Sequence, residues 1–496
     1  MLFNSLHFLF FFPVVTACYY ALPHGYRWIL LLAASCYFYM AFVPAYILIL
    51  LFTITVDYAA GLAIERSAGR TRRLFLFASL AANVGVLAVF KYLQFLTGNL
   101  EALARFLHWN YSLHTLEIIL PIGLSFHTFQ AISYTIEVYR RNHPAERHIG
   151  LLALYVLFYP QLVAGPIERP GRLLPQLRRE HAFDYEMVTD GLKLMLWGFF
   201  KKVVIADRLA LLVGPVYDAP ADYPPIALVL ATLFFAWQIY CDFSGYSDIA
   251  VGAAQVMGFT LTQNFRRPYF SGTLAEFWHR WHISLSTWFR DYVYIPLGGS
   301  RTTPLRWQLN VLAVFLLSGL WHGANWTFVA WGGLHGVYLV ASIRTRRFRA
   351  DLARLSRLDR APGLRKAFQV LVTVSFVSFA WIFFRAGSLA AALAFVRHLL
   401  SFSLHDLGLF ALMFSSAAAR RALGLETDTF GRGELLGLAL SVLLLEGVQV
   451  LQERASVRAT LRRQPVMVRW ALYYGALAWI LTFGEFGNRE FIYFQF

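Results

Sequence analysis

Charged residues are scarce in this sequence. Asp, Glu, Lys and Arg make up 15% of its 496 residues, whereas soluble domains carry about 25%. Hydrophobic residues account for 58%. This composition excludes an ordinary soluble protein and predicts an integral membrane protein. Because a spanning helix needs roughly 20 apolar residues, and apolar runs recur along the whole chain, we expect one polytopic all-α transmembrane domain over residues 1–496.

Cysteine and acidic residues are also few. Cys18, Cys36 and Cys241 lie far apart with no Cys-x-x-Cys spacing, which excludes a disulfide framework and a thiolate metal site. Asp and Glu number 28 against 44 Lys and Arg, giving a net charge of +16. The basic residues fall between apolar runs, so membrane topology explains them better than a nucleic-acid partner does.

The apolar runs predict roughly 11–13 membrane segments, including re-entrant ones. The first run has no Lys or Arg before its apolar core, so we interpret it as a retained span and not as a signal peptide. Pro160, Gly165 and Pro166 suggest that the run at 149–166 is re-entrant. The runs are 1–21, 28–42, 45–64, 74–97, 115–139, 149–166, 188–214, 225–258, 307–320, 326–342, 367–384, 435–451 and 466–484, with a patchy stretch at 388–420 that we expect along the interface.

Basic clusters orient these segments. Arginines gather at 66–73, at 140–147 and, most strongly, between Arg344 and Lys366. The positive-inside rule places these clusters in the cytoplasm and the N-terminus outside. The stretch with Asp218 and Asp222 contains no Lys or Arg, which suits an external loop.

Ionisable residues inside membrane segments are costly, and here they gather between about 237 and 335. Asp242 and Asp248 interrupt an apolar run, either as a polar helix-packing patch or as the lining of a polar cavity. Residues 276–291 predict one amphipathic helix with His279, His282, Ser286 and Arg290 on one face. Tryptophans 278, 281 and 288 with Leu285 would fill the other face.

A metal site at Glu276, His279 and His282 has suitable spacing but lacks a further strong ligand, so we expect no metal. A structural, hydrogen-bonding role for His282 remains open.

His322 is the strongest candidate for chemistry. Both arms that flank it end in arginines, and the first arm, 307–320, would be only about 21 Å long as a helix. The break at His322, Gly323 and Asn325 should therefore lie within the membrane, where irregular backbone lines a cavity or is buried in protein. A neutral imidazole there could remove a proton from a hydroxyl that attacks an acyl group. With no Gly-x-Ser-x-Gly motif and no cysteine near His322, direct acyl transfer is preferred over a covalent acyl-enzyme.

Several blocks of sequence resemble the membrane-bound O-acyltransferase family, in particular its bacterial branch that modifies polysaccharides. They comprise the start MLFNS, VAGPIERP at 163–170, QIYCDFSGYSDI at 238–249, RPYF at 267–270, residues 277–299, GLWHGANW at 319–326 and the ending FIYFQF at 491–496. His279 departs from this branch, where we expect Arg, and its role is open.

The resemblance implies a ring of helices around a central tunnel, with the catalytic histidine at His322 and a second characteristic histidine at His282. Asp242 and Asn325 would orient these two. Further tunnel residues would be Asp248, Trp321, Ser286 and Arg290.

The same resemblance implies acetyl-CoA as a cytoplasmic donor substrate, with no bound cofactor. Its partners would be membrane lipids, a periplasmic acetyltransferase and an exported polysaccharide such as alginate, at the bacterial inner membrane. Arg266, Arg267 and Arg290 would attract the donor's phosphates or would simply obey topology. D-alanyl transfer to teichoic acid and a non-enzymatic transporter or channel are the alternatives.

Overall fold

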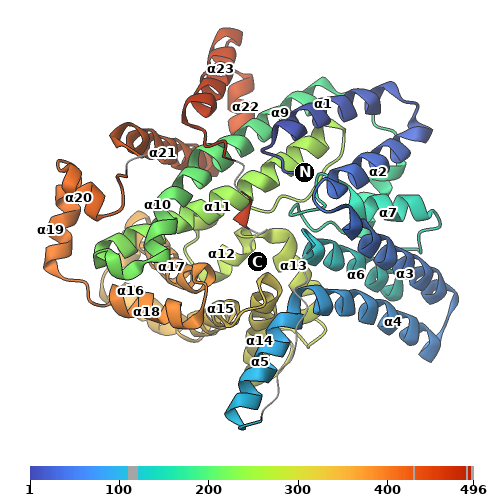
Figure 1. The fold of residues 1–496 in the computed structure, drawn as a ribbon, viewed down its shortest axis with the longest axis horizontal. Helices are drawn as coiled ribbons and strands as arrows, with labels where there is room; N and C mark the ends of the chain where they lie inside the picture. Colours follow the sequence, from blue (N-terminus) through green and yellow to red (C-terminus); the bar gives the residue numbers. More distant parts are fainter. Residues whose placement is uncertain (110–120, 428–429, 488–489, 493–496) are drawn as a thin grey trace. The chain divides into compact units, whose positions relative to one another are not determined.

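The computed structural model describes residues 1–109, 121–427, 430–487 and 490–492. Within these ranges every regular element is a helix, which confirms the predicted all-α class (Figure 1). Part of the predicted run at 115–139 lies outside the described residues; the rest forms a helix that begins at Leu124.

Seven described helices are long and apolar enough to cross a membrane, which confirms a polytopic protein. The remaining predicted segments include shorter helices, two of them strongly apolar, at Leu6–Ala21 and Leu389–Leu399. The seven are Pro44–Arg66, Gly69–Phe106, Pro225–Val256, Trp326–Arg344, Pro362–Arg385, Arg432–Arg454 and Val466–Phe483.

The chain divides into two compact units, one made of residues 1–195 and 246–263, the other of 196–245 and 264–492. Two helical stretches run through both units, namely α11 and the stretch that begins with α9. In the first unit lie α1 (Leu6–Ala21), α2 (His24–Met40), α3 (Ile47–Arg66), α4 (Gly69–Leu87), α5 (Leu93–Phe106), α6 (Leu124–Arg140), α7 (Ile149–Leu157), α8 (Pro170–Arg178) and most of α9 (Tyr185–Phe199).

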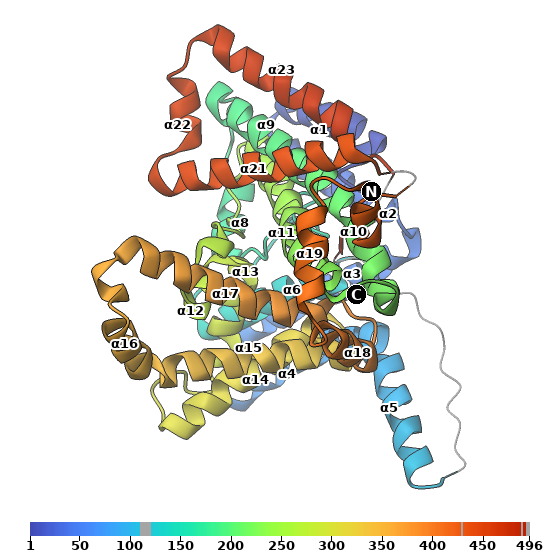
Figure 2. The same cartoon turned by 90° about the vertical axis from the view of Figure 1, so that its left-hand side faces the viewer.

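The second unit holds the later helices. They are α10 (Asp207–Asp218), much of α11 (Pro225–Val256), α12 (Leu274–Arg280), α13 (Ile283–Phe289), α14 (Pro304–His322), α15 (Trp326–Arg344), α16 (Arg346–Leu355), α17 (Pro362–Arg385), α18 (Leu389–Leu399), α19 (Leu404–Leu412), α20 (Ala417–Ala422), α21 (Arg432–Arg454), α22 (Val457–Arg462) and α23 (Val466–Phe483). Helices α21 and α23 pack together and are joined through α22 (Figure 2).

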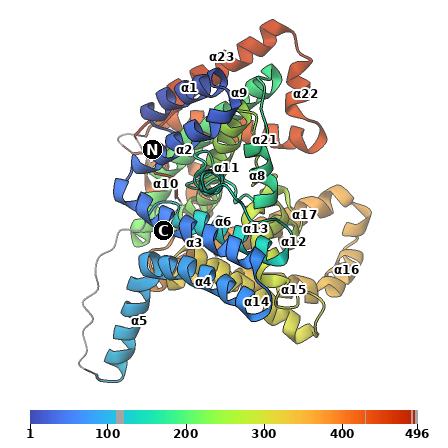
Figure 3. The ribbon, with the colours of Figure 1, turned by 90° about the vertical axis from the view of Figure 1, so that its right-hand side faces the viewer.

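In the first unit, α3, α4 and α6 lie side by side (Figure 3). They enclose a buried carboxylate, that of Asp57. Ser79 and Asn83 of α4 and Thr135 of α6 donate hydrogen bonds to Asp57 of α3, at 2.5 to 3.1 Å. Polar groups buried between membrane helices need such partners, because lipid supplies none. This cluster fixes the packing of the three helices.

The run at 149–166 forms only the nine-residue helix α7, about 14 Å long, which is too short to cross the hydrocarbon core. The chain then turns through buried, irregular backbone at 158–167. A short, broken segment is what the prolines and glycine of this run predict.

Helices α14 and α15 form an antiparallel hairpin in the second unit, with α17 against α15 (Figure 2). A Cβ atom at Gly319 would lie 2.2 Å from the carbonyl oxygen of Phe328, and one at Gly332 would lie 2.2 Å from that of Phe315. Only glycine permits this backbone approach.

The predicted first arm of this hairpin was too short. Thr303 caps α14, Pro304 begins it, and the helix extends to His322 itself. Its 19 residues are about 28 Å long, close to the thickness of the hydrocarbon core. The length of the arm therefore does not place the break at membrane depth, and that placement stays a prediction.

Candidate active site

His322 is the last residue of α14, at the turn of the hairpin. Gly323 follows in extended conformation, and a Cβ atom there would collide with the Phe328 ring at 2.1 Å. Asn325 then caps the start of α15. The backbone break predicted at 322–325 is therefore present, and it leaves His322 only 4% exposed.

Aromatic rings surround the His322 imidazole. Among the described residues, its ring neighbours include Trp321 at 4.9 Å, Trp331 at 5.0 Å and Phe384 at 5.5 Å between centroids, with interplanar angles of 71–87°. Trp331 belongs to α15 and Phe384 to α17, so three helices build the enclosure. A reacting group beside His322 would lie in a water-poor setting.

The His282 ring lies 6.4 Å from the His322 ring and is fully buried. It also contacts Phe243 of α11 at 4.6 Å and Trp321 at 6.1 Å. The structure thus brings together the two histidines that the sequence singled out, from segments 40 residues apart in sequence.

The single amphipathic helix predicted for 276–291 is wrong. The chain forms two short helices, α12 and α13, broken at Trp281 and His282. His282 adopts left-handed backbone angles, φ 43° and ψ 55°. Asn264 accounts for the break, because its carbonyl oxygen accepts from the amide of Ile283 (2.9 Å) and its side chain from that of Ser284 (3.2 Å). These bonds satisfy the first amides of α13 in place of a continuous helix.

The four polar residues predicted to share one helix face therefore lie in different surroundings. His279 is exposed and bonds to the carbonyl oxygen of Ala275, while Ser286 donates to that of Trp281. Arg290 is exposed, pairs with Asp291 and begins a π-helical segment, Arg290–Tyr294. Of the four residues on that predicted face, only His282 contacts the His322 ring in the described structure.

Asn325 acts locally as a helix cap. Its side-chain oxygen accepts from the amide of Thr327 at 3.1 Å, and its nitrogen donates to the carbonyl oxygen of Gly387 at 3.0 Å. It therefore ties the start of α15 to the segment after α17. Trp321, in contrast, contacts both histidine rings directly.

Asp242 and Asp248 do not share one setting. Asp242 is buried in the second unit, where its carboxylate bonds to Lys202 of a π-helical segment, Phe200–Ala206. Asp248 lies on the part of α11 that belongs to the first unit, and it is partly exposed. The role of each stays a prediction.

Two buried residues of the second unit, Lys202 and His335, were not predicted from the sequence. Lys202 stands in the predicted run 188–214, where a charged residue in an apolar run was the available signal. His335 of α15 is fully buried against Trp278 and Trp331, at 4.9 and 5.1 Å. His335 follows Trp331 by four residues, a spacing that places both side chains on one helix face. This spacing was the signal available in the sequence.

The basic residues near this segment are engaged in ion pairs. Glu453 accepts from Arg267 (2.6 Å) and Arg280 (3.0 Å), and Glu276 lies 2.8 Å from Arg280 and 3.4 Å from Lys366. The carboxylate of Glu276 is thus already paired with Arg280 and Lys366. Among the residues that the structure describes, no group of three or more His, Cys, Asp or Glu gathers to hold a metal ion.

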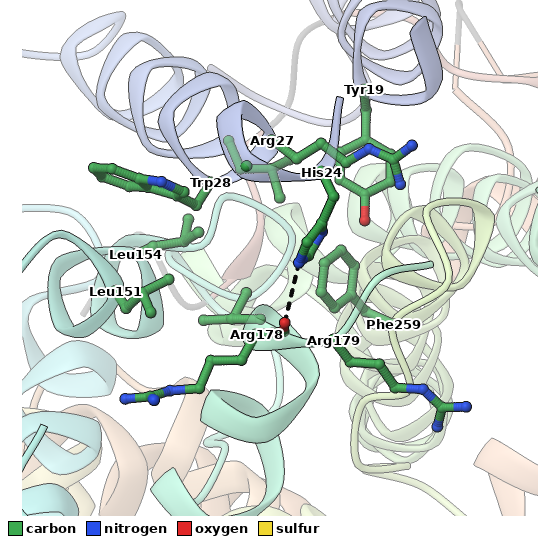
Figure 4. Close-up of a pocket in the computed structure, with 12 residues that line it drawn as sticks. Tyr19, His24, Arg27, Trp28, Leu151, Leu154, Arg178, Arg179 and Phe259 are labelled. Carbon is green, nitrogen blue, oxygen red and sulfur yellow. Dashed lines mark hydrogen bonds between the residues drawn. The ribbon is translucent and has the colours of Figure 1, made fainter. Parts of the chain in front are cut away.

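A separate cavity of about 270 Å³ lies in the first unit, between α2, α7 and α8 (Figure 4). His24 bonds to the carbonyl oxygen of Arg178 at 3.1 Å across it. The guanidinium of Arg178 pairs with Glu146, and Figure 4 shows it pointing away from that of Arg179. Its arginines do not converge on a common ligand position. The lining consists of Tyr19, His24, Gly25, Arg27, Trp28, Leu31, Leu151, Leu154, Leu177, Arg178, Arg179 and Phe259.

The chain is an all-α protein that encloses two histidines at the turn between α14 and α15. These features are found in a known class of membrane enzyme. The model of the membrane-bound O-acyltransferase family matches residues 86–384, so the chain belongs to that family and is a multi-pass membrane O-acyltransferase. The matched range includes both histidines and residues of both compact units.

Individual members of this family are similar to the chain over most or part of its length. A probable alginate O-acetylase of Azotobacter vinelandii is 38% identical over 81% of this chain and 78% of its own length. A peptidoglycan O-acetyltransferase of Helicobacter pylori is 34% identical over 80% of this chain and 79% of its own. A teichoic acid D-alanyltransferase of Streptococcus thermophilus is 29% identical over 47% of this chain and 63% of its own length.

Proposed function

We propose that this chain transfers an acetyl group from a cytoplasmic donor across the bacterial inner membrane for O-acetylation of an exported polysaccharide. The single observation that carries the proposal is the pair of buried imidazoles, His322 and His282, whose rings lie 6.4 Å apart in an aromatic enclosure. The kinship with two O-acetylating enzymes supports acetyl as the group that moves.

His322 acts as the general base in this proposal. Its imidazole accepts the proton of an acceptor hydroxyl while the hydroxyl oxygen attacks the acetyl carbonyl carbon. The acyl–sulfur bond of a thioester donor then breaks, and the leaving thiolate takes up a proton. His282 positions donor or acceptor beside His322 or assists the movement of that proton.

Acetyl-CoA is the proposed donor substrate, and a periplasmic acetyltransferase the proposed partner that passes the group to the polymer. Two of the arginines proposed to meet the donor phosphates differ in their surroundings. Arg267 is paired with Glu453, whereas Arg290 is exposed and paired with its sequence neighbour Asp291. Arg290 is therefore the better candidate to meet a phosphate, and Arg266 stays with it as a second one.

The proposed acceptor polymer is defined by the ester that it carries. The two O-acetylating relatives act on different glycans by name, alginate and peptidoglycan. What they share is an acetyl ester on a sugar hydroxyl, and this ester is the product that we propose.

The test is the acetyl-ester content of exported polysaccharide from cells that lack this protein, with and without the intact chain restored. Loss of the ester and its recovery with the chain is the expected result. An unchanged ester content without the chain would contradict the proposal. Recovery of D-alanyl esters, or solute flux that persists in His322→Ala, would favour one of the two alternatives.

A further inference from the structure

A buried ion cluster in the second unit includes Asp242, which directly precedes the phenylalanine that packs on His282. The acyl-transfer chemistry does not explain this cluster. Lys202 is fully buried, and its Nζ lies 2.9 Å from Asp207 Oδ1 and 2.5 Å from Asp242 Oδ1. Lys202 belongs to the π-helical segment Phe200–Ala206, and π-helical turns inside longer helices are frequent at functional sites.

The cluster binds the segment Glu490–Ile492. The amide of Ile492 donates to Asp242 Oδ2 at 2.7 Å, so the two carboxylate oxygens of Asp242 hold different partners. Lys202 Nζ lies 3.4 Å from the carbonyl oxygen of Glu490 and 4.2 Å from the centroid of the Phe491 ring. Phe491 and Ile492 are themselves buried.

Asp242 connects this segment to the candidate active site through its neighbour in sequence. Phe243 follows Asp242 on α11, and its ring packs edge-on against His282 with centroids 4.6 Å apart. A shift or rotation of α11 at Asp242 would therefore move the ring that supports His282.

Stability alone is a poor explanation for such a cluster. Replacing a buried ion group with apolar side chains of similar volume is often neutral or stabilising, because desolvation offsets the attraction between the charges. What buried charges do provide is a defined geometry, since each charge tolerates few arrangements of its partners.

We propose that Lys202, Asp242 and the backbone of Glu490–Ile492 are positioning residues that hold Phe243 and thereby orient His282 toward His322. The inference rests on the proposed acyl transfer. The segment near the end of the chain is in this sense part of the active-site scaffold.

The sharpest test removes one hydrogen-bond donor. Ile492→Pro lacks the amide that Asp242 accepts from, whereas Ile492→Val keeps that amide and a similar side chain. Acetyl transfer from acetyl-CoA is measured in membrane vesicles from cells that express each chain, and the amount of folded protein is measured by size-exclusion chromatography in detergent.

We expect Ile492→Pro to lower kcat on the order of tenfold to hundredfold, as misplaced catalytic groups do, with KM for acetyl-CoA within about twofold of the unmodified chain. Ile492→Val should retain kcat. Equal kcat for the two variants would overturn the proposal, as would a loss that the amount of folded protein fully explains.

If Ile492→Pro does not accumulate, a second variant tests whether the cluster positions Phe243. Asp242→Asn keeps the shape of the side chain but removes the charge that pairs with Lys202 and one of the two acceptor oxygens. We expect kcat to fall on the order of tenfold at a KM for acetyl-CoA within about twofold of the unmodified chain, and an unchanged kcat would contradict the inference. No acetyl transfer by the unmodified chain would instead contradict the proposed function.

Discussion

At the scale of single residues, His282 combines an active-site side chain with an unusual backbone. Its φ of 43° lies in the left-handed region, which costs a residue other than glycine roughly 1–2 kcal/mol. Asn, Asp and His occur in this conformation more often than other non-glycine residues do, and β-branched residues tolerate it least. Strained backbone of this kind tends to persist where function requires it.

We predict different outcomes for two substitutions of His282. His282→Asn tolerates the left-handed backbone, so the protein should accumulate with a melting temperature near that of the unmodified chain while acetyl transfer falls. His282→Val should in addition lose about 1–2 kcal/mol of stability, because its branched side chain opposes positive φ. Thermal unfolding in detergent and acetyl-transfer rates are the two measurements.

Equal melting temperatures for the two variants would contradict the strain argument. Full activity of His282→Asn would contradict a role of the imidazole itself.

The setting of a single residue could be predicted where its sequence neighbours determine it. His322 stood out because Gly323 and Asn325 interrupt an apolar run, and the structure has the break there. The charge of Lys202 within an apolar run was a local signal, but its pairing with carboxylates 5 and 40 residues away was not predictable. Long-range pairing of this kind leaves no periodic pattern.

At the scale of elements, the α14–α15 hairpin depends on the contact between Gly319 and Gly332. We predict that Gly332→Ala forces the two helices apart, because its Cβ would lie 2.2 Å from the backbone oxygen of Phe315. Overpacking of this kind costs typically about 1–3 kcal/mol. The melting temperature and the acetyl-transfer rate should both fall.

The neighbouring glycine provides the control. A Cβ at Gly333 would meet only Leu316 at 3.6 Å, an ordinary contact, so Gly333→Ala should retain stability and activity. A similar effect of both substitutions would mean that helix propensity, and not the close approach, governs this position.

A helix could be predicted only where its own sequence pattern determines where it begins and ends. The apolar runs gave the long helices, but the helix predicted for 276–291 breaks at His282 because Asn264 bonds to the amides of Ile283 and Ser284. Asn264 precedes that helix by ten residues or more, so helical periodicity within 276–291 cannot report it.

At the scale of the whole molecule, the basic loops determine orientation. We predict that a cysteine introduced at Ser300 or Thr345, at the outer ends of the hairpin, faces the cytoplasm, and that one introduced at Asp222 faces outside. An impermeant maleimide added to intact cells should label position 222 alone. Permeabilised cells should label all three.

The background for this experiment is the chain with both Cys18→Ser and Cys36→Ser, since Cys18 is exposed and Cys36 half-buried, whereas Cys241 is buried. Labelling of Ser300→Cys or Thr345→Cys in intact cells would contradict the cytoplasmic placement of both ends of the hairpin.

The whole-molecule class followed from composition alone. Scarce charge and recurrent apolar runs indicated a polytopic helical protein, and seven described helices are long and apolar enough to span a membrane. The division into two compact units was not predictable, because α11 runs unbroken through both. A helix carries no local mark where it passes from one packed unit to the next.

The most direct test of the account concerns His322. Cells that lack this protein receive the intact chain, His322→Ala or His405→Ala, which alters an exposed histidine of α19, at matched membrane levels. Acetyl esters on exported polysaccharide should return with the intact chain and with His405→Ala, and should remain absent with His322→Ala. Full restoration by His322→Ala would contradict the proposal that this imidazole acts as the general base in acyl transfer.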